Sequence, residues 1–64
     1  MGIPNAIAAY KKCLELSPNF TKARFNLGYI YAVNGSKPLA REQYNALLNI
    51  DADLAAKLLA AINK

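Results

Sequence analysis

A chain of 64 residues forms one small domain at most and buries only about 60% of the surface that its unfolded form exposes, so its core is thin. Apolar residues make up 55% and charged residues 19% of the chain, which excludes an intrinsically disordered segment. The net charge is +4, but the eight Lys and Arg residues are scattered, which argues against a nucleic-acid surface.

The first predicted element is a helix over residues 4–17. Its apolar side chains recur at steps of three or four residues and so share one face; they are Ala6, Tyr10, Cys13, Leu14 and Leu16. The dipeptide that follows, Ser17-Pro18, interrupts the pattern, because a proline disfavours helical backbone in the residue before it.

A second helix is predicted from residue 20 to residue 33. The 3.6-residue period is carried by Phe20, Ala23, Leu27, Ile30 or Tyr31, and Asn34. We expect Asn19 to cap the free amides of its first turn, because an asparagine side chain accepts hydrogen bonds there. We expect Gly35 to end the helix, because glycine readily adopts the left-handed conformation that closes one.

The third and fourth helices are predicted by their starts. Pro38 suits the first turn of a helix, with Ser36 or Lys37 at the cap position. Asp51 and Asp53 open a further helix, since carboxylates favour the positive end of the helix dipole. In this last helix the apolar face is formed by Leu54, Ala55, Leu58, Leu59 and Ile62, and Lys57 lies on the other face.

The chain also repeats itself at an offset of 34 residues. The offset places Pro4 on Pro38, Ala6 on Ala40, Tyr10 on Tyr44, Leu14 on Leu48, Cys13 on Leu47 and Leu16 on Ile50. Four helices joined by short loops predict antiparallel neighbours that stack in chain order. The sequence therefore indicates a helical solenoid.

The segment Arg24–Tyr31 resembles the first helix of a tetratricopeptide (TPR) repeat, whose pattern Leu27, Gly28 and Tyr31 match directly. Further positions of that pattern are matched by Ala40 and Tyr44, and by Ala6, Tyr10 and Pro18 of a preceding half-repeat. The small Gly28 and Ala40 suit a close helix crossing, with the tyrosines filling the space beside them.

The resemblance implies an all-α fold of antiparallel helical hairpins, stacked as a short right-handed solenoid of four helices. Residues 1–64 would form a single domain, with 4–17 as the second helix of a partial repeat, 20–50 as the full repeat and 52–63 as a capping helix. Arg24 stands where the family prefers tryptophan, so we expect its stem to pack along the hairpin and its head to reach water.

The resemblance also implies a binding surface for a peptide or a partner helix. By position, the concave surface comprises Lys22, Phe25, Asn26, Tyr29, Ala32 and Val33. Asn26 corresponds to an asparagine that hydrogen-bonds the main chain of bound peptides, and Lys22 adds a positive charge suited to an acidic group. Packing against a neighbouring helix is the alternative role for Phe25 and Tyr29.

Other function classes find less support in the residues. The chain has no histidine and one cysteine, Cys13 on an apolar face, so we predict no enzyme activity, catalytic residue, metal or cofactor. The N-terminal residues show no secretory signal, which favours a cytoplasmic location, and we expect no membrane span. Two alternatives remain open: self-assembly through the uncovered apolar face of the first helix, as a homo-oligomer, and more weakly RNA binding.

Overall fold

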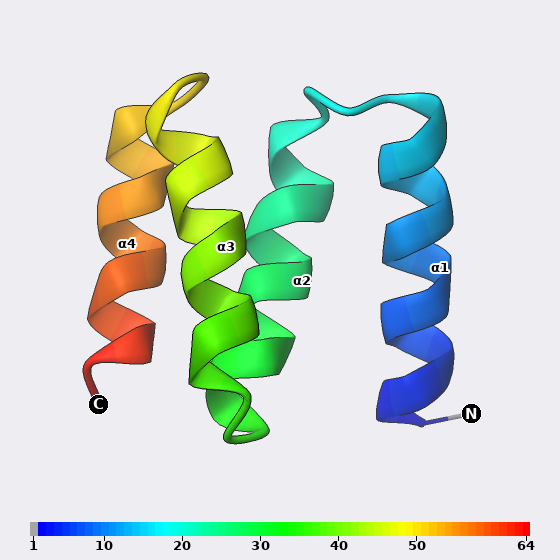
Figure 1. The fold of residues 1–64 in the computed structure, drawn as a ribbon, viewed down its shortest axis with the longest axis horizontal. Helices are drawn as coiled ribbons and strands as arrows, with labels where there is room; N and C mark the ends of the chain where they lie inside the picture. Colours follow the sequence, from blue (N-terminus) through cyan, green and yellow to red (C-terminus); the bar gives the residue numbers. More distant parts are fainter. Residues whose placement is uncertain (1) are drawn as a thin grey trace.

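A computed structural model describes residues 2–64 and contains four α-helices joined by short turns (Figure 1). They are α1 (Ile3–Leu16), α2 (Thr21–Val33), α3 (Lys37–Leu48) and α4 (Ala52–Ile62). Successive helices run antiparallel, and in the view of Figure 1 the two terminal helices, α1 and α4, lie at the two edges of the molecule. The predicted all-α stack of four helices is therefore confirmed.

The apolar core lies where α2, α3 and α4 meet. Its buried residues are Leu14, Ala23, Leu27, Tyr31, Ala32, Ala40, Leu47, Ala55, Leu58 and Ile62. Only Leu14 comes from α1, which contacts α2 and none of the other helices in the part of the chain that the structure describes. The helix bundle is thus a tight three-helix unit with α1 attached to one side of it (Figure 1).

Gly28 lies where α2 approaches both α3 and α4 closely. A Cβ atom at this position would lie 2.6 Å from Leu58 Cδ2 on α4 and 3.0 Å from Gln43 Cβ on α3. Ala40, the other small residue expected at the crossing, has no exposed surface, and Tyr31 is 5% exposed. Close packing at Gly28 therefore joins α2 to α3 and α4, as its small size predicts. That Tyr31 and Tyr44 fill the space beside Gly28 and Ala40 stays a prediction.

The turn after α2 forms as its glycine predicts. Gly35 has a φ of 85°, in the left-handed region that side-chain-bearing residues rarely adopt. The Ser36 N–H donates to the Tyr31 carbonyl at 2.8 Å, and the Gly35 N–H donates to the Ala32 carbonyl at 3.3 Å. This pair of bonds is a Schellman motif, which satisfies two carbonyls at the helix end and reverses the chain into α3.

The predicted helix caps are partly wrong. Asn19 does not cap α2, because a turn closed by the Phe20 N–H and the Ser17 carbonyl at 3.0 Å makes Phe20 the N-cap residue. Ser36 occupies the N-cap position of α3, but its side chain makes no capping hydrogen bond. Asp51 does cap α4, since its Oδ1 accepts from the Leu54 N–H at 3.0 Å.

Some residues assigned to apolar faces lie outside the core. Leu16 is 76% exposed and Phe20 is 47% exposed, because each stands at the end of a helix beyond the last packed turn. Asn34 is the exposed C-cap of α2. None of the helices in residues 2–64 combines the length and the apolar character that a membrane span requires.

Candidate functional site

The residues proposed for peptide binding occupy one outer face of α2. Lys22, Asn26, Tyr29 and Val33 are exposed, and Phe25 is half-buried beside them. Their spacing of three or four residues places them together on the helix surface, which we call the α2 face. Ala32 does not belong to it, because only 8% of this residue is exposed and it forms part of the core.

An aromatic pair dominates the α2 face. The rings of Phe25 and Tyr29 stack with their centroids 6.2 Å apart and an interplanar angle of 23°. Phe25 packs against the apolar core, whereas Tyr29 keeps 48% of its surface exposed. The half-buried Phe25 ring therefore supports the exposed Tyr29 ring on the α2 face.

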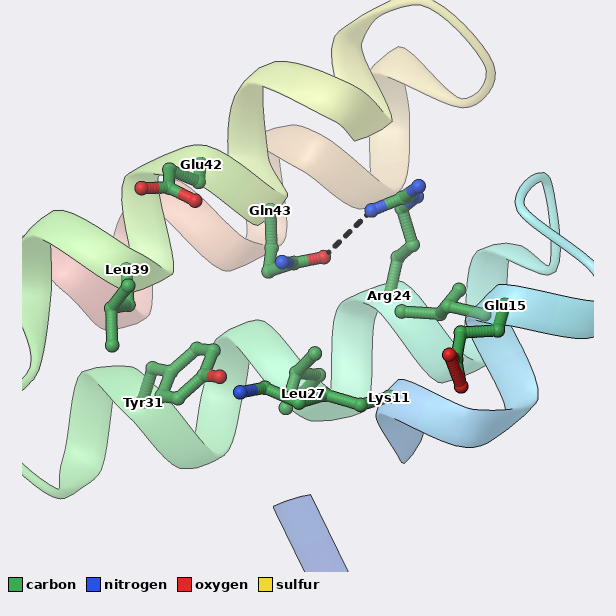
Figure 2. Close-up of a pocket in the computed structure, with 9 residues that line it drawn as sticks. Lys11, Glu15, Arg24, Leu27, Tyr31, Leu39, Glu42 and Gln43 are labelled. Carbon is green, nitrogen blue, oxygen red and sulfur yellow. Dashed lines mark hydrogen bonds between the residues drawn. The ribbon is translucent and has the colours of Figure 1, made fainter. Parts of the chain in front are cut away.

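A second surface lies on the other side of α2, where the sequence analysis placed no site. A groove of about 570 Å³ runs between α1 and α3, with α2 as its floor (Figure 2). Leu14, Leu27, Tyr31 and Leu39 supply its apolar lining, and Glu15 of α1 and Glu42 of α3 stand on its two walls. We call this surface the α1–α3 groove.

Arg24 closes one end of the α1–α3 groove. Its Nε donates to the Pro18 carbonyl at 2.9 Å, and its NH1 donates to Gln43 Oε1 at 3.0 Å (Figure 2). The guanidinium was expected to reach water, and its bond to Pro18 is solvent-exposed, but the two hydrogen bonds themselves were not predicted. The planar guanidinium, which has several fixed donors, joins the α1–α2 turn to α3. Among residues 2–64, no other side-chain hydrogen bond connects these two parts of the fold.

The sequence carried no local signal for this groove. Its walls come from two helices that do not contact each other, so it exists only because α1 and α3 both pack on α2. The pairing of Arg24 with Gln43, 19 residues apart, likewise depends on the tertiary fold. The cysteine, by contrast, needs no functional account: Cys13 is partly buried and packs against the core.

The chemistry at both surfaces is that of contact and hydrogen bonding. Among residues 2–64, no three His, Cys, Asp or Glu side chains gather where they could hold a metal ion. The α2 face offers an amide, a stacked aromatic pair and a lysine. The α1–α3 groove offers apolar side chains together with two cations, Lys11 and Arg24, and two carboxylates, Glu15 and Glu42.

Comparison with known proteins gives one match. A family model described as the TPR repeat matches residues 3–35, which is more than half of the chain and covers α1, the turn and α2. Neither the search of curated proteins nor the search of solved structures found a match. The matched segment, together with the packing of Gly28 and Tyr31 described above, shows that the chain belongs to the TPR repeat family.

Proposed function

We propose that this protein is an interaction module that binds a peptide or a partner helix through the α2 face. Proteins of the TPR repeat family generally mediate protein–protein interactions, and they typically serve as scaffolds rather than enzymes. The observation that carries the proposal is the exposed Tyr29 ring, which stacks on a core-anchored Phe25 beside the free Asn26 amide. Aromatic residues held rigidly at a surface are typical anchors of protein interfaces.

Each group on the α2 face has a separate role in this proposal. Asn26 provides a donor and an acceptor, so it can bond the main chain of an extended partner whatever its sequence. Tyr29 and Val33 supply apolar contact area, and 62% of the Val33 surface is exposed. Lys22 adds a positive charge that favours an acidic side chain or a terminal carboxylate.

Replacing Asn26 by alanine should weaken a peptide bound at the α2 face by about 1 to 3 kcal/mol, because its partner groups lose their hydrogen bonds. The peptide can be selected from a random display library against the intact chain, and its Kd measured by isothermal titration calorimetry. Asn45→Ala, at an exposed asparagine of α3, is the matched control and should leave the affinity unchanged. Equal affinities for both variants would remove Asn26 from the site.

A second candidate function is self-association through α1. The repeat equivalents Ala40 and Leu47 have no exposed surface, whereas Ala6 and Cys13 remain partly exposed at the same positions of α1. If another helix packed on the side of α1 that carries Ala6 and Cys13, as α2 packs on α3, it would cover these two residues. We propose that a second copy can supply this contact at high concentration.

The mass of the protein in solution tests this second candidate. Light scattering over a hundredfold range of concentration should show a rise from the monomer mass, and Leu16→Lys should reduce the rise, because Leu16 lies at the end of α1 with 76% of its surface exposed. A constant monomer mass over the whole range would exclude self-association.

A further inference from the structure

We propose that the turn between α2 and α3 is a modification site, at which Asn34 loses its side-chain ammonia without an enzyme and becomes aspartate or isoaspartate. Asn34 is the only asparagine in the sequence that precedes a glycine. A glycine leaves its backbone nitrogen accessible to the side chain before it, because it carries no Cβ. The reaction uses neither the α2 face nor a ligand, so the inference goes beyond the proposed function.

The chemistry needs only water and the two residues of the turn. The Gly35 nitrogen gives its proton to water and attacks Asn34 Cγ, which is close because the attack is intramolecular. The Cγ–Nδ2 bond breaks, the leaving nitrogen takes a proton from water and departs as ammonia, and a succinimide ring remains. Water then opens the ring. Cleavage between the glycine nitrogen and Cγ yields aspartate, and cleavage between that nitrogen and the backbone carbonyl carbon yields isoaspartate.

The surroundings of the turn leave room for this ring to form. Asn34 and Gly35 are both exposed, in the α2–α3 turn at the lower end of the molecule in Figure 1. A Cβ atom built on Gly35 would have no neighbour within 4 Å, so no other element covers the attacking nitrogen from that side. Among residues 2–64, none of the side-chain hydrogen bonds involves Asn34. The side chain is therefore free to turn toward the next residue.

The Schellman motif at the end of α2 slows the reaction in the folded protein. Asn34 has a ψ of 3°, which turns the Gly35 nitrogen toward the backbone nitrogen of Asn34 and away from its side chain. Ring closure requires rotation about the Asn34 Cα–C bond, and this rotation breaks the 2.8 Å bond from the Ser36 N–H to the Tyr31 carbonyl. The Gly35 N–H is held more weakly, by a 3.3 Å bond to the Ala32 carbonyl. Conversion therefore proceeds when the turn opens, at a rate set by the open fraction.

The products weaken the turn that guarded the asparagine. Isoaspartate adds a methylene group to the main chain, which displaces the Ser36 N–H from the Tyr31 carbonyl. Both products place a carboxylate at the negative end of the α2 dipole, where an anion is unfavourable. Conversion at Asn34 thus loosens the connection that holds α3 against α2.

Incubation of the intact chain near pH 8 and 37 °C, followed by peptide mapping with tandem mass spectrometry, tests the site. Asn34 should convert first, whereas Asn19 and Asn45, which are exposed but precede larger residues, should stay unmodified over the same period. A capped peptide of residues 31–38 supplies the rate without the fold, and the folded chain should react roughly five- to a hundredfold more slowly.

Three results would overturn the proposal. Earlier conversion at another asparagine would remove the preference for Asn34, and equal rates in the chain and the peptide would show that the turn does not guard it. A folded chain without product at Asn34 after about ten half-lives of the peptide would show that opening is too rare for modification.

Two variants at Ser36 isolate the backbone hydrogen bond. Ser36→Pro removes the N–H that bonds to the Tyr31 carbonyl, so Asn34 should convert faster, toward the rate of the matching capped peptide. Ser36→Ala keeps this N–H and removes a hydroxyl that makes no capping bond, so it should convert like the wild type. Equal rates for the two folded variants would contradict the guarding role of the turn.

The converted chain can also be isolated, since it has lost one unit of positive net charge and elutes earlier from a cation exchanger. Its thermal unfolding, followed by circular dichroism, should have a lower midpoint than that of the unmodified chain, because the Schellman motif is broken. An unchanged midpoint would refute the claim that conversion loosens the turn.

Discussion

Replacing Gly28 by valine should lower the free energy of unfolding by about 3 kcal/mol, which is the upper range for overpacking a close-packed core. Even the first added atom, Cβ, would lie 2.6 Å from Leu58 Cδ2 and 3.0 Å from Gln43 Cβ. Leu58 has no exposed surface and Gln43 Cβ belongs to the packed stem of its side chain, so neither neighbour moves freely. Urea unfolding followed by far-UV circular dichroism measures the loss.

Two further variants make this result specific to the crossing. Ala56→Val places the same side chain on the exposed surface of α4 and should cost less than about 1 kcal/mol, the difference in helix propensity. Leu58→Ala removes the atom nearest to the added Cβ, so the double variant Gly28→Val, Leu58→Ala should be less destabilised than the sum of the single variants. Similar losses for Gly28→Val and Ala56→Val would show that the helices do not meet at Gly28.

Replacing Leu47 by alanine should lower the free energy of unfolding by about 2 to 5 kcal/mol, the usual range for a fully buried leucine. Leu47 has no exposed surface and lies in the last turn of α3, the helix packed against both α2 and α4. A domain of this length has a total stability of roughly 3 to 10 kcal/mol, so the variant should be close to unfolding at room temperature.

The neighbouring residue provides the control for Leu47. Leu48→Ala makes the same chemical change in the same helix, but Leu48 keeps 45% of its surface exposed, so its loss should be under about 1 kcal/mol. Thermal unfolding followed by circular dichroism should therefore give similar midpoint temperatures for the wild type and Leu48→Ala, and a much lower one for Leu47→Ala. The reverse order would mean that α3 turns its other face toward the core.

Much of the fold could be predicted from the sequence because helices are local structures. The 3.6-residue spacing of apolar residues, together with the residues that start the third and fourth helices, identified all four helices, and Gly35 marked the end of α2. Asn19 was assigned wrongly for a local reason too: a hydrogen-bonded turn shifted the start of α2 by one residue, to Thr21. Where a helix begins depends on such turns, because their backbone hydrogen bonds compete with the hydrogen bonds that a capping side chain can make.

The candidate binding residues were only partly accessible to sequence reasoning. The 3.6-residue helical period places Asn26 and Tyr29 on a different face of α2 from the buried Leu27. Their exposure therefore follows from the sequence once the core side of the helix is known. That they bind a partner stays a prediction, since exposure and stacking support it without testing it. Ala32 was placed on the wrong side, because a small residue carries little information about which neighbour covers it.

The sequence by itself determined the four helices, the need for a small residue at Gly28 and most of the buried residues, because residue spacing and residue size act within one or two turns. Only the tertiary structure decided where Arg24 directs its hydrogen bonds, how far Leu39 stays exposed, and that Glu15 and Glu42 share one groove. These features join residues of different helices. Their relation depends on how α1 and α3 are set against α2, and no periodicity within a single helix encodes that arrangement.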